Sequence, residues 1–312
     1  MENLIISINC VIPIFVTFLV GYYARSRRIV PESVFPQLST LCFHVLLPVM
    51  MFNNVYSADF REAFSARLLT FLVLATCAVF GIACILSFAF VRDHRYRGTL
   101  IQVYYRSNIA VVGVALAQVL MDASGVATMT IAVSVLVPMY NVFAVIALEL
   151  CRGGKVRWGQ TLKNVARNPL ILGTVLGAAF LLLRIRLPLP VESAVSSIGK
   201  TGSVMTLIAL GASFDFSKLG GQLKRMAFCS ALRLILVPAA VLAVALLLGF
   251  RDSELAVILI CTGTPIATTT FPMAQVYDSD YELAGQLVVS TSMLSCLSMF
   301  LWIFALKEFA LL

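Results

Sequence analysis

The sequence predicts an all-α polytopic membrane protein whose ten transmembrane helices form two inverted five-helix repeats. Three observations predict this fold class: an apolar composition, ten long apolar runs, and short matches between the two halves of the chain. Of the 312 residues, 60% are hydrophobic and 12% are charged, and the mean hydropathy is +0.97. Because a soluble domain carries about 25% charged residues, the excess apolar side chains are expected to face lipid.

The apolar runs set the positions of the expected helices. A bilayer core about 30 Å thick is crossed by about 20 apolar residues in a helix. Runs of this length lie at residues 4–24, 34–57, 67–91, 98–121, 124–149, 168–186, 192–214, 226–250, 254–277 and 282–306. The loops between them are short, so no separate soluble domain is expected.

The basic residues indicate the orientation of these helices. The net charge is +8, but the Lys and Arg residues lie mostly in short loops, so we expect no nucleic-acid partner. Loops after the odd-numbered runs carry fourteen of them, and the opposite side carries six. The positive-inside rule therefore predicts cytoplasmic odd loops and both termini outside. The first run is expected to be a retained helix, because Glu2 precedes it and basic residues follow it.

Short matches between the two halves predict an internal repeat. Ala117-Gln118-Val119 recurs as Ala274-Gln275-Val276 at an offset of 157 residues, and Asp59-Phe60 recurs as Asp215-Phe216 at an offset of 156. An odd number of spans per repeat forces the second copy into the opposite orientation, as in many secondary transporters. The expected units are residues 1–150 (first repeat), 151–167 (cytoplasmic connector) and 168–312 (second, inverted repeat).

Two of the expected helices, 98–121 and 254–277, carry helix-weakening residues near mid-span. The second contains Pro265 and Pro272, and a proline removes an amide donor and clashes with the preceding turn. At the offset of 157, Asn108 in the first helix matches Pro265. Broken backbone at membrane depth is tolerated where protein or a water-filled cavity satisfies it. Paired breaks therefore indicate a binding site near the midplane, unless the prolines only kink packed helices.

The residues around the two breaks favour an anionic ligand. The half-helix after a break presents unpaired N–H groups and the positive end of its dipole. Further donors are available from side chains. The candidate substrate-binding residues at the breaks are Ser107, Asn108, Thr264, Pro265 and Thr268.

Arg106 is the strongest single candidate for contact with the substrate. Arginine inside the membrane costs roughly 2.5–3.5 kcal/mol on insertion scales, so it usually faces a cavity or a partner. Its planar fork matches a carboxylate through two hydrogen bonds. The alternatives are snorkelling to an interface or pairing with an acid such as Asp122 or Glu149.

Three other basic residues fall within the predicted spans. His44 and Lys200 occupy matching positions at the offset of 156, and both are further candidates for substrate binding. Their alternatives are helix packing for His44 and snorkelling for Lys200. Arg233 is expected to snorkel to the cytoplasmic interface.

Several motifs are missing from the sequence. It contains no P-loop, HExxH or GxSxG pattern, so we expect no enzyme. No Asp or Glu lies clearly at mid-span, so no carboxylate relay for protons or sodium is evident. The eight Cys residues form no zinc-ligand spacing. No cofactor and no metal are expected.

The segment Arg106-Ser-Asn-Ile-Ala-Val-Val-Gly113 resembles the helix-4 motif of the auxin efflux carrier family. Thr264-Pro-Ile-Ala, followed by Phe271-Pro-Met-Ala-Gln-Val-Tyr-Asp278, is similar to the helix-9 motif of that family. The resemblance extends over essentially the whole chain. One departure is that Gly113-Val-Ala stands where the family usually has Gly-Leu-Pro, so the first break is expected to form without proline.

The resemblance implies that helices 4 and 9 cross at their breaks. It further implies a scaffold of helices 1, 2, 6 and 7, a mobile part of helices 3–5 and 8–10, an elevator-like movement and a homodimer. The compact chain is similar to the bacterial type, which is associated with malonate, malate and related carboxylates. That type implies a bacterial cytoplasmic (inner) membrane.

The leading functional hypothesis is a secondary transporter of a small mono- or dicarboxylate. The second hypothesis is a membrane receptor or sensor that binds an organic anion without moving it, through the same pocket. An intramembrane enzyme is a third hypothesis, for which the sequence offers no recognisable nucleophile or acid–base pair.

Overall fold

The computed structural model describes residues 2–57, 65–152, 158–214 and 219–312. The expected match between Asp59-Phe60 and Asp215-Phe216 lies outside these residues. The described helices in the first half are α1 (Glu2–Ser26), α2 (Val34–Leu41), α3 (Leu47–Tyr56), α4 (Ala66–Phe90), α5 (His94–Tyr105), α6 (Val114–Leu120) and α7 (Ala123–Leu150). Those in the second half are α8 (Trp158–Ala166), α9 (Pro169–Leu182), α10 (Leu189–Ser213), α11 (Leu219–Ala231), α12 (Val237–Leu247), α13 (Asp252–Gly263), α14 (Thr270–Val276) and α15 (Tyr281–Glu308). Three short π-helical turns adjoin these helices: η1 (Cys42–Leu46) lies between α2 and α3, η2 (Ile109–Gly113) precedes α6, and η4 (Leu232–Leu236) lies between α11 and α12.

Helix boundaries follow local capping chemistry. Asn168 accepts the amide of Leu170 at 2.9 Å and stands directly before a first-turn proline, Pro169. This confirms an N-terminal boundary that the sequence indicates. Side chains also cap α4, α5, α7 and α15; the capping residues are Ser65, Asp93, Asp122 and Asp280.

The described helices coincide with the predicted apolar runs. Among the described residues, six continuous helical segments are long and apolar enough to cross a membrane, and they lie at 34–56, 66–90, 123–150, 189–213, 222–247 and 281–308. Shorter apolar helices lie at 12–26, 109–120 and 169–182. The predicted run 254–277 is divided between α13 and α14. The chain is therefore an all-helical polytopic membrane protein.

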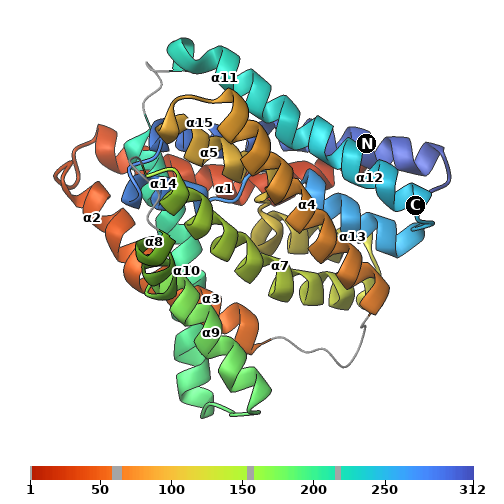
Figure 1. Cartoon of the computed structure of the whole chain (residues 1–312), viewed down its shortest axis with the longest axis horizontal. Helices are drawn as coiled ribbons and strands as arrows, with labels where there is room; N and C mark the ends of the chain where they lie inside the picture. Colours follow the sequence, from red (N-terminus) through yellow and green to blue (C-terminus); the bar gives the residue numbers. More distant parts are fainter. Residues whose placement is uncertain (1, 58–64, 153–157, 215–218) are drawn as a thin grey trace.

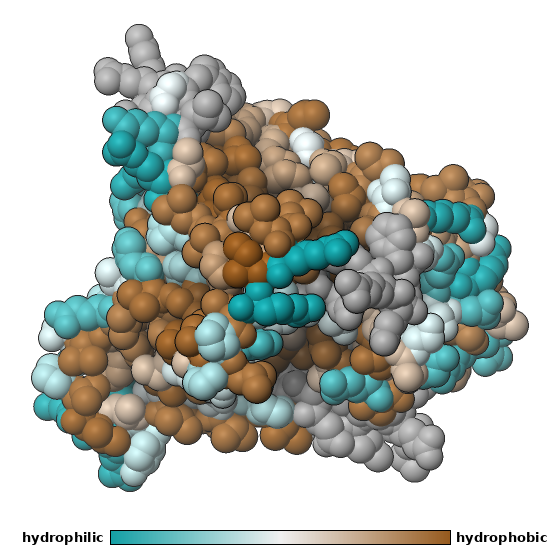
Figure 2. All heavy atoms as spheres, turned by 90° about the horizontal axis from the view of Figure 1, so that it is seen from below, coloured by the Kyte–Doolittle hydropathy of each residue, from teal (hydrophilic) through white to brown (hydrophobic). Residues whose placement is uncertain are grey.

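The outer surface of the molecule agrees with this assignment. Large apolar side chains project outward, among them Leu247 and Leu189, which are 87% and 82% exposed. Figure 2 shows broad hydrophobic areas on one face, with hydrophilic residues at its margins and a smaller hydrophilic group near its centre. Such continuous exposed apolar area is typical of a surface covered by lipid.

One group of helices is held together by glycines. In Figure 1, α3, α9 and α10 lie together at the lower end of the view. A methyl group at Gly173 or Gly177 of α9 would come within 2.3 Å or 2.6 Å of a carbonyl oxygen of α3. Gly21 of α1 and Gly211 of α10 meet each other's helix in the same way. Only glycine permits such close approach of two helix backbones.

α2 packs on α10 and belongs to this first group, whereas α4, α5, α7 and α11 to α15 form a second group. α4 packs on α5, α12 packs on α13, and both α11 and α14 pack on α15. α7 contacts α4, α5 and α13, and it also touches α3 and α9 of the first group. The two helix breaks lie in this second group, α5 to η2 and α13 to α14.

Candidate functional site

The two breaks cross and are joined through their backbones. α5 ends at Tyr105, and the next residues are extended, with Arg106 at φ −88° and ψ 95°. The amide of Asn108 donates to the carbonyl of Pro265 at 2.8 Å, and that of Ala267 donates to the carbonyl of Arg106 at 3.1 Å. Ser107 and Ile266 thus form an antiparallel bridge. Each break supplies the hydrogen-bond partners that the other has lost, as unwound backbone inside a membrane requires.

Pro265 lies within the second break, as the sequence predicts. Pro272 does not open the helix, because it lies in the first turn of α14, where a missing amide costs little. The first break forms without proline. Gly113 packs tightly in η2, where an added Cβ would lie 2.9 Å from Met129 and 3.1 Å from Ile260.

Arg106 extends from the first break into the protein and is 1% exposed. Its guanidinium donates to Gln102 Oε1 and Asn141 Oδ1 at 2.6 Å each, and to Thr269 Oγ1 at 2.7 Å. All three acceptors are neutral. Within the described ranges Arg106 forms no ion pair, so neither snorkelling nor pairing with an acid describes its environment.

The two acids considered as partners for Arg106 are engaged elsewhere. Asp122 caps the amide of Gly125 at 2.8 Å, and Glu149 pairs with Arg152 at 3.6 Å. Arg106 therefore brings a buried positive charge without a balancing carboxylate. An anion is the ligand that would balance this charge.

A cavity of about 40 Å³ adjoins Arg106, which is room for a water molecule or two. Its wall is shared between the crossing and the glycine-held group: the lining includes Arg106, Asn108 and Thr268 from the breaks, Met50 from α3 and Ser203 from α10. Asn108 is 4% exposed, and its Nδ2 donor has no hydrogen-bond partner. A buried donor left unpaired calls for an explanation, and a ligand oxygen in this cavity would supply it.

The remaining candidates at the breaks divide between two faces of the crossing. Thr268 is 3% exposed and lines the cavity of Arg106. Ser107 lines it too, but its hydroxyl donates to the carbonyl of Cys261 and accepts from Arg233. Thr264 places its carbonyl against Arg233, and its own Oγ1 is buried without a partner.

His44 and Lys200 are not brought into this cavity. Both side chains are exposed, and His44 Nδ1 lies 3.0 Å from the carbonyl of Thr40 in its own helix. They project outward because their positions fall on the outer faces of η1 and α10. The cavity therefore lends no support to a role for them in binding, which stays a prediction.

Arg233 contradicts the expectation that it snorkels. It is 1% exposed and points into the crossing, where it donates to the carbonyl of Thr264 at 3.0 Å and to that of Tyr104 at 3.1 Å. The reason is chemical: the carbonyls left free at the two breaks accept its donors inside the protein. This residue joins both breaks and was not a site candidate from the sequence.

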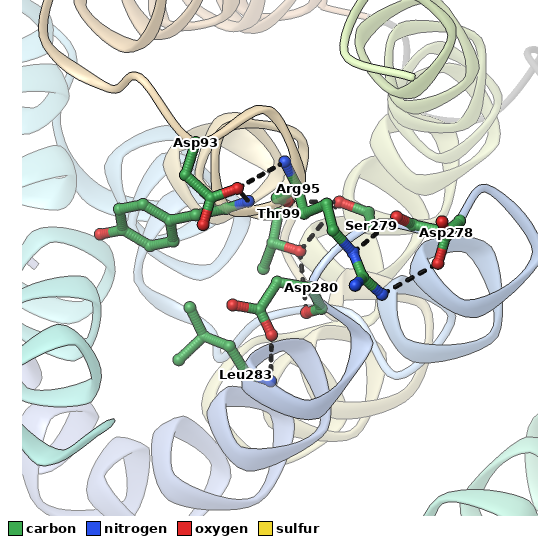
Figure 3. A network of polar contacts seen from close by, with 8 residues as sticks. Asp93, Arg95, Thr99, Asp278, Ser279, Asp280 and Leu283 are labelled. Atoms are coloured by element: carbon green, nitrogen blue, oxygen red, sulfur yellow. Dashed lines mark hydrogen bonds and ion pairs between the residues drawn. The ribbon is translucent and has the colours of Figure 1, made fainter. Parts of the chain in front are cut away.

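A polar network ties the two broken helices together at the end where α5 begins (Figure 3). Arg95 Nη2 pairs with Asp278 Oδ1 at 2.9 Å, Ser279 donates to the carbonyl of Arg95 at 2.7 Å, and Thr99 donates to that of Asp280 at 3.0 Å. Burial raises the pKa of the Asp280 carboxyl, and the hydrogen bond from the amide of Leu283 opposes this shift without cancelling it. α5 and the loop before α15 are thus held as one body.

Sequence reasoning also missed the residues that hold Arg106. Gln102 precedes Arg106 by four positions and therefore lies on the same helix face. Asn141 interrupts the apolar helix α7, where a polar side chain is uncommon and usually has a partner. Both signals were present in the sequence, and each pointed to a buried hydrogen bond.

Comparison with known proteins agrees with this geometry. Residues 6–303 match the model of a family described as membrane transport protein. The chain is also similar to an uncharacterized transporter of Methanocaldococcus jannaschii, with 23% identity over 309 residues, covering 95% of this chain and 98% of that protein. The protein is thus a multi-pass membrane transporter and not an enzyme. The chain belongs to the membrane transport protein family, which is the family of the auxin efflux carriers.

Proposed function

We propose that the protein is a secondary transporter of a small mono- or dicarboxylate, such as malonate or malate. The observation that carries this proposal is the Arg106 guanidinium, which is buried beside a cavity without an acidic partner. Three of its five N–H donors are used by neutral acceptors. The others, with the unpaired Nδ2 of Asn108, are available to a carboxylate.

The charge and the hydrogen bonds select the class of substrate. A carboxylate accepts charge-assisted hydrogen bonds from a guanidinium, and these are stronger than bonds between neutral groups. The N–H groups left on Arg106 are that of Nε and one of Nη1. The half-helix that starts after Asn108 adds the positive end of its dipole. A cation or a neutral sugar would gain nothing from this combination.

Two inverted repeats of five helices are part of the proposal. Adding 156 to Gly21 and Phe52 gives Gly177 and Ile208. Gly21 packs against the carbonyl of Ile208, and Gly177 packs against the carbonyl of Phe52. The correspondence of the α1–α10 contact with the α9–α3 contact at this offset supports the repeat. The pairing of Asn108 with Pro265 at the offset of 157 supports the same relation.

An elevator-like movement is also part of the proposal, and the positions of the cavities support it. The glycine-held helices α1, α3, α9 and α10 would form the scaffold, and the group with both breaks would move. The cavity at Arg106 has walls from both groups. A larger one, of about 210 Å³, is likewise lined by Arg25 and Ala212 from the scaffold and by Gln275 and Gln286 from α14 and α15. Ligand at this boundary is carried when one group slides past the other.

The remaining features concern the membrane and the assembly. The distribution of basic loops supports an orientation with both termini outside, and the bacterial cytoplasmic membrane rests on the resemblance to the bacterial type. A homodimer joined through the scaffold also rests on that resemblance, and it would cover exposed apolar side chains such as Leu172, Val175 and Leu176 of α9. The mass of the purified protein in detergent would test this: a monomeric mass would remove the dimer and leave the carrier intact.

Uptake of labelled malonate into liposomes containing the purified protein tests the function. We expect saturable uptake that a subset of unlabelled carboxylates displaces. Arg106→Gln should abolish it, whereas Arg186→Gln, an exposed arginine far from the breaks in sequence, should not. Uptake equal to wild type in the Arg106 variant would contradict the assigned role.

A receptor that binds the anion without moving it is the alternative, since the same cavity would serve. A single cysteine at Val111, which lines this cavity, separates the two. A carrier exposes the cysteine in turn to reagents on both sides of the membrane, and added substrate changes the balance. Labelling from one side alone, with malonate still raising thermal stability, would favour the receptor.

A further inference from the structure

The second buried arginine at the crossing, Arg233, has surroundings of a different kind. Its acceptors are two backbone carbonyls and one hydroxyl: those of Tyr104, Thr264 and Ser107. Nε and Nη2 both donate to Thr264, at 3.1 and 3.0 Å. Within the described residues Arg233 forms no ion pair.

The carbonyls belong to the ends of two half-helices. Tyr104 lies in the last turn of α5, and Thr264 directly follows α13. A helix C-terminus carries about −0.5 of an elementary charge, so two such ends together offset about one positive charge. Arg233 is therefore compensated by the backbone, whereas Arg106 is not.

The set of oxygens around Arg233 is also the set that a hard monovalent cation takes. In secondary transporters with broken helices, unwound carbonyls and half-helix C-termini coordinate Na⁺ or H⁺. Here the guanidinium fills that place. The space beside it is only about 20 Å³ and is walled largely by apolar groups of α4 and α12, among them Leu72 and Val237.

The two arginines adjoin different cavities, whose linings share one residue, Tyr140. The space beside Arg106 is lined by scaffold residues Met50 and Ser203. The space beside Arg233 is lined by α4, α7, α12 and the breaks, so it lies within the group that would move. Arg233 would therefore travel with the crossing through the whole cycle.

We propose that Arg233 is a permanent resident cation, which occupies the place of a coupling cation and makes the crossing independent of Na⁺. If the proposed function holds, one uncompensated positive charge is left, that of Arg106. The carrier would then balance one carboxylate group of its substrate with Arg106 and would move that substrate without a sodium ion.

Thermal stability in detergent tests the resident cation without reference to transport. Wild type should melt at the same temperature in sodium chloride and in choline chloride. Arg233→Ala leaves three oxygens facing an empty space. It should melt several degrees lower in choline chloride and recover part of that loss in sodium chloride. A merely structural role would not produce this cation response.

Two further variants make the test decisive. Arg233→Met fills the space without a charge, so it should be destabilised and should not respond to sodium. Arg233→Lys keeps a charge and should stay insensitive to sodium, and it serves if the alanine variant does not fold. The proposal is overturned if sodium specifically stabilises wild type, or if the methionine variant is as stable as the lysine variant.

Malonate uptake with sodium replaced by choline on both sides of the liposome is the second measurement. Uptake by wild type should be unchanged, and a requirement for sodium would overturn the proposal. If wild type takes up no malonate at all, the proposed function fails. The melting experiments still decide the role of Arg233.

Discussion

The two faces of the crossing each hold a fully buried arginine, yet they differ in what accepts its hydrogen bonds. Arg233 donates to carbonyls at two helix ends, whose partial negative charges balance it. Arg106 donates to three neutral side chains and keeps its charge unbalanced. Burial alone therefore does not mark a binding residue. The residue that lacks compensation, beside a cavity and an unpaired donor, is the one available to a ligand.

The largest expected effect is on binding at the Arg106 face. Arg106→Gln should weaken malonate binding by about a hundredfold, since a charge-assisted contact is lost. The glutamine can satisfy at most two of the three acceptors of Arg106, but the mutation also removes an unbalanced buried charge, so the melting temperature should change less than in Arg233→Gln. Isothermal titration and thermal melting of the same sample measure both. A large fall in melting temperature with binding retained would show that Arg106 is the structural residue of the two and not the binding residue.

The Arg233 face should show the opposite pattern. Arg233→Gln leaves at least one of the Tyr104 and Thr264 carbonyls without a donor, at a cost of about 1–3 kcal/mol for each buried group. The melting temperature should drop, and the affinity for malonate of the protein that remains folded should stay within a few-fold of wild type. Denaturation followed by circular dichroism gives the first quantity and titration the second. Equal loss of both would show that the two faces are not separate.

The next effect concerns the scaffold, whose close glycine contacts can be tested by their contribution to thermal stability. Gly21→Ala places a methyl 2.0 Å from the Ile208 carbonyl, and overpacking of this kind typically costs 1–3 kcal/mol. Gly81→Ala is the matched control, because nothing lies within 4 Å of its added Cβ. The control should melt as wild type or slightly above. Similar melting temperatures for the two variants would contradict the close α1–α10 contact.

The smallest expected effect concerns Asn108. Asn108→Ala removes one neutral donor to the ligand, so binding should weaken by about fivefold, since one hydrogen bond is worth about 1 kcal/mol. Its Nδ2 has no partner in the protein, so stability should change little. Titration with malonate measures the effect. Unchanged affinity would show that the ligand does not contact Asn108.

The fold was largely predictable because lipid imposes a simple requirement. Runs of about 20 apolar residues fixed the helices, and the described helices coincide with those runs. The break in the second broken helix was predicted from Pro265. The first break carries no proline and is held open by a hydrogen bond to a residue 157 positions away, which no local propensity contains.

The candidate site was predictable only in part, because sequence gives the depth of a residue in the membrane and not the direction it faces. Arg106 and Arg233 lie at similar depths in their predicted spans, yet only Arg106 was taken as a site candidate and Arg233 was expected to snorkel. The structure buries both equally. His44 and Lys200 were chosen because they occupy matching positions in the two halves, but both side chains face outward. Direction depends on tertiary packing, which the helical pattern of a uniformly apolar segment does not encode.

The small cavity beside Arg106 affects the dissociation constant that a binding experiment would measure. A space that admits a water molecule or two does not admit a dicarboxylate, so the ligand must select a rarer form in which the walls have parted. The measured dissociation constant is then the intrinsic one divided by the population of that form. Each tenfold scarcity of the open form weakens apparent binding by about 1.4 kcal/mol. Trimming Met50 at the wall would raise that population, so a weak binder could become a tight one without any new contact to the anion.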